Sequence, residues 1–149
     1  MTVSPELVVL DARDLMNMLP HRHPFVMLDA AEIHSPGIAG VGYKVISISD
    51  PIFAGHFPGD PIYPGVMLIE AAGQTCGVVF GHGNAAAQGL GYLAGVRRFL
   101  FRRVVRPGDR VAFRARFKIS LGTLHDFDVS IWVGNEQVAN GTLAISLGH

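Results

Sequence analysis

The second half of the chain limits the possible folds most strongly, because its apolar residues alternate with polar ones and no helical stretch interrupts them. From 111 to 119 two sets of side chains take opposite faces of an expected strand: Val111, Phe113, Phe117 and Ile119 against Arg114, Arg116 and Lys118. Phe127–Val133 repeats this alternation, and Gly134-Asn135 predicts a turn into a last strand over Gln137–Ser146. About four strands are expected from Gly91 onward. Parallel strands need long crossover connections, so these strands should be antiparallel.

The first half contains one long helical candidate, Gly65–Phe80. Val66, Ile69, Gly73 and Gly77 recur at spacings of three and four, and Pro64 precedes the helix as a start signal. The two glycines lower helix stability, so we expect them to pack closely against other backbone.

Shorter elements precede that helix. Asp11–Leu19 predicts a short helix, and Phe25–Ile33 and Ile38–Ile48 predict two strands around a turn at Ser35-Pro36-Gly37. The order predicts an α+β fold in which one long central helix is wrapped by a curved antiparallel β-sheet.

Composition points to a single globular domain over residues 1–149. The chain is 49% apolar and 16% charged, which excludes a disordered chain and leaves few polar residues to cover a monomer, so we expect a buried subunit interface. The single cysteine, Cys76, excludes an internal disulfide. There is no leader-like N-terminus and no membrane-length apolar run, so we expect a soluble cytoplasmic protein that does not bind membranes.

The charge is zero overall but unevenly placed. Eight of the 12 Lys and Arg residues fall between Arg97 and Arg116, all of them arginine, with Asp109 as the only acid among them. Arginine suits bidentate recognition of phosphate and carboxylate groups, so the cluster predicts an acidic partner or a phosphate. No nucleic-acid motif or interleaved exposed aromatic residue supports nucleic acid as that partner.

The loop before the long helix carries the candidate chemistry. His56 lies in a segment stiffened by Pro58, Pro61 and Pro64, and Glu70 is a lone carboxylate in the apolar helix that follows. An imidazole and a carboxyl group that face a dry pocket can act as an acid–base pair. Gly65 opens the helix without a Cβ, so a substrate carbonyl could approach the free N–H groups of the first turn.

Residues 56–74 read His-Phe-Pro-Gly-Asp-Pro-Ile-Tyr-Pro-Gly-Val-Met-Leu-Ile-Glu-Ala-Ala-Gly-Gln. This segment closely resembles the FabZ-type β-hydroxyacyl-acyl carrier protein dehydratases, whose pattern is His-Phe-Pro-Gly-x-Pro-Ile-x-Pro-Gly-Val-x-x-x-Glu-Ala-x-x-Gln. The likeness continues in Leu19–Phe25 with Asp29, and in Phe101–Asp109. It covers roughly residues 15–146.

The resemblance implies a hotdog fold and a homodimer, often assembled as a trimer of dimers, with active sites at the dimer interface. It implies His56 of one subunit as the catalytic base and acid, and Glu70 of the other as the carboxylate that handles the departing hydroxyl. The remaining candidates are the thioester-binding N–H groups of Gly65 and Val66, an orienting Gln74 and a tunnel-lining Phe57.

The implied reaction is reversible loss of water from a 3-hydroxyacyl thioester on acyl carrier protein, giving the trans-2-enoyl thioester without cofactor or metal. We expect Arg98, Arg102 and Arg103 to bind the acidic carrier or its phosphopantetheine arm. Departures from the family pattern at His23, Phe99-Leu100, Val104 and Arg106 leave two pathways open, housekeeping fatty-acid synthesis and specialised polyketide or polyene assembly.

Three other functions remain open. A hotdog thioesterase would hydrolyse the thioester, but such enzymes typically work with a carboxylate and lack the His-Phe-Pro-Gly loop. A non-catalytic subunit could bind the carrier alone, although His56 and Glu70 argue against it. A sister family that also isomerises the enoyl product usually carries Asp where Glu70 stands.

Overall fold

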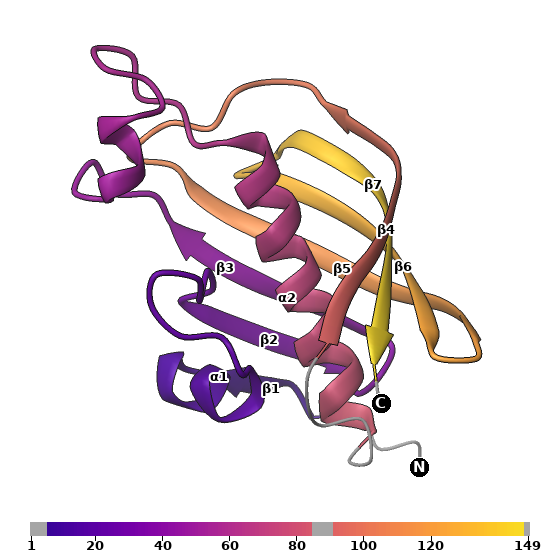
Figure 1. Cartoon of the computed structure of the whole chain (residues 1–149). Helices are drawn as coiled ribbons and strands as arrows, with labels where there is room; N and C mark the ends of the chain where they lie inside the picture. Colours follow the sequence, from indigo (N-terminus) through magenta and orange to yellow (C-terminus); the bar gives the residue numbers. More distant parts are fainter. Residues whose placement is uncertain (1–5, 85–90, 148–149) are drawn as a thin grey trace.

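The computed structural model describes residues 6–84 and 91–147 (Figure 1). Two α-helices, one 3-10 helix and seven strands follow one another in the order β1 Val8–Leu10, α1 Ala12–Met18, β2 Ala30–Ser35, β3 Ala39–Val45, η1 Pro51–Ala54, α2 Gly65–Gly83, β4 Gly91–Phe101, β5 Arg110–Leu121, β6 Leu124–Val133 and β7 Glu136–Leu147. None of the helices in these ranges has the length and apolar character that crossing a membrane requires.

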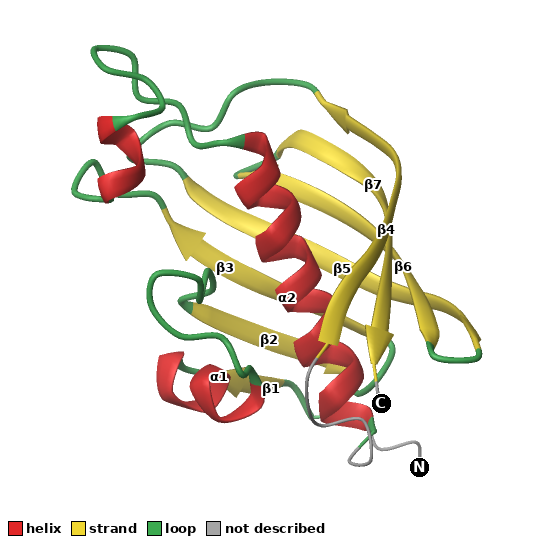
Figure 2. Ribbon diagram, in the orientation of Figure 1, coloured by secondary structure: helices red, strands yellow, loops and turns green. Residues whose placement is uncertain are grey.

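The strands form one antiparallel sheet in the order β1-β2-β3-β5-β6-β7-β4, and α2 lies across one of its faces (Figure 2). The sheet curves around this helix, and β4 forms an edge that pairs only with β7 among the described strands. The predicted α+β architecture, one long helix wrapped by an antiparallel sheet, is therefore confirmed.

Contact between α2 and the sheet depends on two glycines of β3. A Cβ on Gly42 would lie 2.3 Å from Thr75 Oγ1, and one on Gly40 would lie 2.8 Å from Val79 Cγ2. Only a residue without a side chain lets the helix approach β3 this closely. Thr75 and Val79 are fully buried in the core that results.

Several boundaries differ from the sequence-based expectation. The long helix begins at Gly65 as predicted but continues to Gly83, and the short helix begins after Asp11, whose side chain caps it. The strand β1 and the 3-10 helix η1 were not predicted. Both are very short, and a three-residue strand carries no periodicity that a pattern could detect.

The strand predicted over Phe25–Ile33 is wrong in its first half, since β2 begins only at Ala30. The Gln74 side chain replaces a strand partner here: its Nε2 donates to the Phe25 carbonyl at 2.8 Å, and its Oε1 accepts from the Met27 N–H at 2.9 Å. An apolar segment can thus leave the sheet without losing its hydrogen bonds.

The inward face predicted for β5 holds for Val111 and Phe113, which are fully buried, and fails at Ile119, which is 50% exposed. A register shift between Phe117 and Ile119 in the pairing of β5 with β6 reverses the alternation. The inward face of β6 is as predicted, with Phe127, Val129 and Ile131 buried.

Candidate active site

His56 is held by backbone hydrogen bonds on both sides of its loop. The Asp50 carboxylate caps η1 through the Ile52 N–H at 2.9 Å, and the His56 N–H donates to the Ile52 carbonyl at 3.1 Å. The Ile62 N–H returns to the His56 carbonyl at 3.1 Å. The loop is therefore closed on itself, and the position of the imidazole does not depend on the proline residues alone.

The ring of His56 is fixed in one tautomer. Its Nδ1 lies 2.6 Å from the carbonyl oxygen of Ile62. A carbonyl can only accept a hydrogen bond, so Nδ1 must carry the proton and donate it. In the neutral ring Nε2 is then unprotonated and can take up a proton, as a general base must.

Phe57 follows His56 and covers its ring, with the two ring centroids 4.0 Å apart. The Phe57 and Asp60 backbones exchange two hydrogen bonds, and Arg106 forms an ion pair with Asp60 at 2.6 Å. Almost half of Phe57 is exposed in the single chain. An apolar ring held at the surface beside a candidate base is available to contact an apolar substrate or another subunit.

Glu70 lies one helical turn before Gln74 and accepts a hydrogen bond from it. Gln74 Nε2 is 2.9 Å from Glu70 Oε1, and Gln74 itself is only 3% exposed. The hydrogen bonds from Gln74 to Phe25 and Met27 fix this amide in place. Its contact with Oε1 therefore restrains the carboxyl group.

The structure also places His21 beside Glu70, a contact that the sequence reading did not identify. His21 Nε2 lies 3.5 Å from Glu70 Oε1, and both side chains are about three-quarters buried. Within the described residues His21 Nδ1 is buried with no hydrogen-bond partner. The only sequence signal was the position of His21 in the Leu19–Phe25 segment.

Glu70 and His21 face a cavity of about 60 Å³ that continues along one side of α2. Its helical wall is made of Gly73, Gly77 and Gly81. A Cβ on Gly77 or Gly81 would meet no described atom within 4 Å. The expectation that these glycines pack closely against other backbone is therefore wrong for Gly77. It is also wrong for Gly73, where an added Cβ would meet only side-chain atoms of Ile145 and Leu93 among the described residues, at 3.8 and 4.0 Å. The glycines of this helix face keep open a slot that leads away from Glu70.

The start of α2 lies close to β4. Pro64 is the N-terminal cap residue and provides no side-chain hydrogen bond, so the first N–H groups, those of Gly65 and Val66, have no partner inside the helix. A Cβ on Gly65 would lie 3.0 Å from the Phe101 ring, and Val66 is 72% exposed. These N–H groups are available to an outside acceptor.

Within one chain His56 and Glu70 do not meet. Across the described residues they share neither a hydrogen bond nor an ion pair: His56 contacts Ile62, and Glu70 contacts Gln74 and His21. Within the same ranges no group of three His, Cys, Asp or Glu side chains could hold a metal ion.

Burial affects two groups near this region. Burial raises the pKa of the Tyr63 hydroxyl, and the negative charges of Asp50 and Asp29 raise it further. Burial also raises the pKa of the Cys76 thiol, which lies fully inside the core. Neither group provides an ionised nucleophile near neutral pH.

The three arginines expected to bind a carrier differ in their contacts. Arg103 is held by Glu136 at 2.8 Å and by Asp109 at 3.2 Å, whereas Arg102 reaches only the Asn140 amide oxygen at 3.0 Å. The side chain of Arg98 has no ion pair or hydrogen bond to any described residue. Arg103 is therefore a structural link between strands, whereas no described carboxylate compensates the charge of Arg98 or Arg102.

Comparison with known proteins identifies the family of the chain. Residues 19–142 match the family model of the FabA-like domain. The chain is 38% identical over 142 residues to the 3-hydroxyacyl-(acyl-carrier-protein) dehydratase FabZ of Syntrophomonas wolfei, covering 93% of this chain and 96% of that protein. It is 40% identical over 138 residues to the FabZ of Teredinibacter turnerae, covering 91% and 94%.

Solved structures support the fold. The dehydratase heterocomplex ApeI:P from Xenorhabdus doucetiae superposes with a TM-score of 0.76 at 21% identity, covering 91% of both chains. A point mutant of the fluoroacetyl-CoA-specific thioesterase FlK superposes with a TM-score of 0.60 at 12% identity, covering 77% of this chain and 88% of that one. The fold is thus shared with proteins of different activity, whereas the sequence relationship is specific: the chain belongs to the FabA-like domain family and, within it, to the FabZ-type dehydratases.

Proposed function

We propose that this chain catalyses the reversible dehydration of a 3-hydroxyacyl thioester, carried on acyl carrier protein, to the trans-2-enoyl thioester in fatty-acid synthesis. The family relationship supports the reaction. A catalytic role for a particular residue is supported by the 2.6 Å hydrogen bond from His56 Nδ1 to the Ile62 carbonyl. This hydrogen bond leaves Nε2 as a base beside an apolar surface.

The proposed step moves two protons. His56 Nε2 takes a proton from C2 of the substrate, and the electrons of that C–H bond form the C2=C3 double bond as the C3–O bond breaks. Glu70, in its protonated form, donates a proton to the departing hydroxyl, which leaves as water. Transfer of the proton from the His56 imidazolium to the Glu70 carboxylate resets the pair, and the same steps in reverse hydrate the enoyl thioester.

Negative charge that develops on the thioester oxygen needs hydrogen-bond donors. The N–H groups of Gly65 and Val66 at the start of α2 are suited to this role, because the helix dipole favours negative charge there. The absent side chain of Gly65 keeps the approach open, and the nearby Phe101 ring limits how far a substituent could intrude.

A homodimer would complete the site. The edge strand β4 has no described partner on its outer side, and its exposed apolar residues include Leu93, Val96 and Leu100. Pairing with β4 of a second copy would cover this edge and bury apolar area. His56 of one subunit and Glu70 of the other then form each site, which accounts for their separation in the single chain. A trimer of dimers is the larger assembly that we propose.

Carrier binding falls to Arg98 and Arg102, since Arg103 is already neutralised by two carboxylates. Exchanging each of the first two for glutamate should raise the KM for carrier-bound substrate and spare short pantetheine thioesters. Equal losses on both substrates would show that these side chains are structural instead.

Mass spectrometry of a 3-hydroxyacyl carrier protein after incubation with the enzyme tests the reaction. Wild type should remove one water, and His56→Ala and Glu70→Ala should each slow this loss by about 10²-fold or more. Release of free acid and thiol would identify a thioesterase. Carrier binding with no chemistry at any chain length would identify a non-catalytic subunit.

A further inference from the structure

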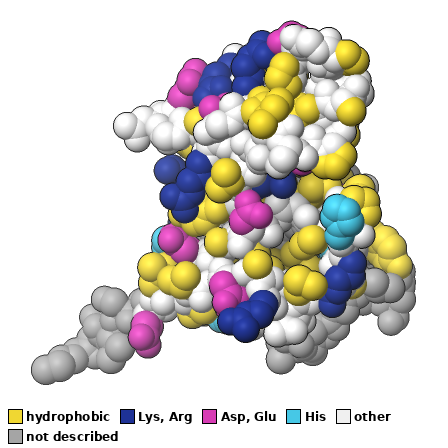
Figure 3. Space-filling model, turned by 90° about the vertical axis from the view of Figure 1, so that its left-hand side faces the viewer, with side chains coloured by type: hydrophobic (Ala, Val, Ile, Leu, Met, Phe, Trp, Pro, Cys, Tyr) yellow, Lys and Arg dark blue, Asp and Glu magenta, His cyan; other side chains and the backbone are white. Residues whose placement is uncertain are grey.

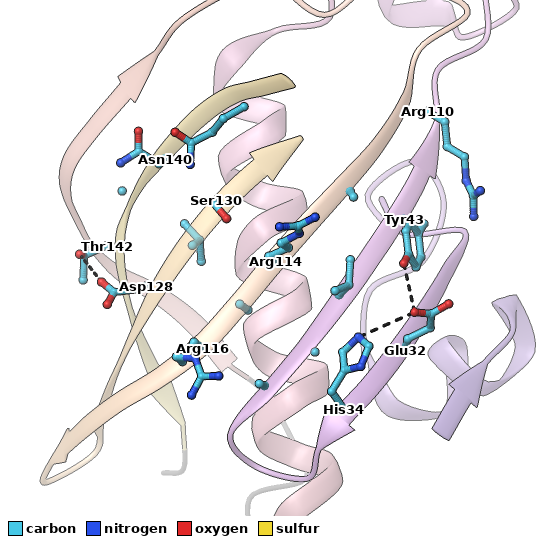
Figure 4. Close-up of a pocket in the computed structure, with 18 of the residues that line it drawn as sticks. Glu32, His34, Tyr43, Arg110, Arg114, Arg116, Asp128, Ser130, Asn140 and Thr142 are labelled. Carbon is cyan, nitrogen blue, oxygen red and sulfur yellow. Dashed lines mark hydrogen bonds and ion pairs between the residues drawn. The ribbon is translucent and has the colours of Figure 1, made fainter. Parts of the chain in front are cut away.

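The face of the sheet that points away from α2 carries a row of arginines on β5. Arg110, Arg114 and Arg116 occupy outward positions along this strand, and we call them the β5 arginine row (Figure 4). They line a hollow of about 1140 Å³ that extends from β2 to β7, and Arg98 of β4 also lines it. The sheet itself separates this surface from α2 and from Glu70.

No described carboxylate lies within ion-pair distance of these three arginines, a property that only Arg98 and Arg102 share among the other five. Three of the other five form ion pairs: Arg97 with Asp126, Arg103 with Glu136 and Asp109, and Arg106 with Asp60. On the face that Figure 3 shows, basic and acidic side chains likewise lie beside one another. The β5 arginine row is therefore a local excess of positive charge in a chain of zero net charge.

Two of the three guanidinium groups rest on aromatic rings. Arg110 lies 4.8 Å from the centre of the Tyr43 ring, and Arg114 lies 4.5 Å from the centre of the Trp132 ring. The Tyr43 hydroxyl donates to Glu32 at 3.1 Å, which fixes the ring. Stacking leaves the N–H edges of a guanidinium free and lowers the entropy cost of ordering it in a complex.

The strands beside the row leave room for a rod-shaped partner. Ala39 lies opposite Arg116 and Val41 lies opposite Arg114 on β3, so the flank beside these two arginines is apolar. On the other flank Ser130 and Asn140 offer hydrogen-bonding groups (Figure 4). This combination of an apolar flank, a polar flank and stacked cations is typical of protein interfaces.

Two carboxylates beside the hollow favour protein over nucleic acid. Glu32 and Asp128 both line it, and they would repel a continuous phosphate backbone. An acidic helix can instead place a few carboxylates against the arginines and other side chains beside Glu32 and Asp128.

We propose that the β5 arginine row is the docking surface for an acidic α-helix of a partner protein, and that this binding is separate from catalysis. Arg114 and Arg116 are two residues apart, about 7 Å along a strand, which matches the spacing of carboxylates at i and i+4 of a helix. Arg110 lies about 20 Å from Arg116 along β5, and a carboxylate at i+11 extends about 16 Å along a helix on nearly the same side. The long, flexible arginine side chains can compensate for the difference between these two lengths.

Binding of a fluorescein-labelled helical peptide tests this proposal. The probe carries glutamate at i, i+4 and i+11, and its isomer carries the same residues spread around the helix. Wild type should bind the first peptide about tenfold more tightly than the second. Arg114→Glu with Arg116→Glu should abolish the difference, and Arg114→Gln with Arg116→Gln should reduce it. Arg13→Glu is the control, because Arg13 lies on α1 with 91% of its side chain exposed, and this substitution should leave the difference between the two peptides intact.

Dehydration of a short pantetheine thioester and of carrier-bound substrate should be unchanged in the β5 variants, and this readout separates the proposal from the assigned reaction. Equal affinity for the two peptides would overturn it, as would tighter binding of a duplex DNA oligonucleotide than of the patterned peptide. The proposal would also be overturned if the β5 variants raised the KM for carrier-bound substrate and not that for the short thioester, because the row would then bind the substrate carrier.

Discussion

Replacing Gln74 by leucine removes the centre of the polar network around Glu70. The amide makes three hydrogen bonds, to the Phe25 carbonyl, the Met27 N–H and Glu70, and is almost fully buried. In the Gln74→Leu variant two backbone groups lose their partners, at about 1–3 kcal/mol each. Burying leucine at this position returns about 1–3 kcal/mol. We therefore expect a net loss of about 1–3 kcal/mol in the free energy of unfolding.

Urea unfolding at a fixed subunit concentration measures this loss, because an oligomer's stability depends on concentration. The midpoint should fall by about 1 M, given m-values of about 1–3 kcal/mol/M. The control is Gln137→Leu, at a glutamine of β7 whose side chain makes no hydrogen bond to a described residue; it should shift the midpoint little. If both variants have the same urea midpoint as wild type, the Gln74 amide does not stabilise residues 25–27.

Three further outcomes follow from contacts in the structure. Gly42→Ala places a Cβ against Thr75 Oγ1, so it should cost about 1–3 kcal/mol in urea unfolding, and less when combined with Thr75→Ala; strict additivity would contradict this. Burial raises the pKa of the Cys76 thiol, so native enzyme should not react with a thiol reagent between pH 7 and 9 but should react at once in denaturant. His21→Asn should lower kcat about tenfold with little change in KM, since it removes the imidazole beside Glu70, the proposed catalytic carboxylate, whereas His23→Asn, at an exposed position, should change neither; equal effects would exclude this role.

Local pattern was sufficient for the regular parts of the fold. The period-two alternation in Phe127–Val133 and the helical spacing from Gly65 onward each follow from burying one face of an element, and both elements are present. At Ile119 the same rule failed, because a shift in strand register moves a side chain to the other face although the sequence still alternates apolar and polar residues.

The contacts around Glu70 lay beyond local pattern. Gln74 binds Phe25 and Met27 across 49 and 47 residues of sequence, so an apolar segment with strand-like composition became a loop. His21 meets Glu70 for the same reason, through the packing of the segment that follows α1 against α2. Such pairs depend on tertiary structure, which composition and spacing do not encode.

The charge cluster shows a similar limit. Eight arginines between Arg97 and Arg116 predicted an acidic partner or a phosphate for the whole cluster, but the alternation along β5 and the turn before it place them on different surfaces. Some are neutralised by acids distant in sequence, such as Arg103 by Glu136, and the β5 arginine row faces solvent on the opposite side of the sheet from α2.

Mixing two inactive variants tests most directly the claim that His56 of one subunit works with Glu70 of the other. His56→Ala and Glu70→Gln subunits with different tags are unfolded together, refolded at equal amounts and assayed on a 3-hydroxyacyl thioester. Half of the dimers are then mixed, and each mixed dimer has one site with both native residues, so we expect about one quarter of wild-type activity. Activity no higher than that of either variant alone, with mixed dimers verified by the tags, would contradict it.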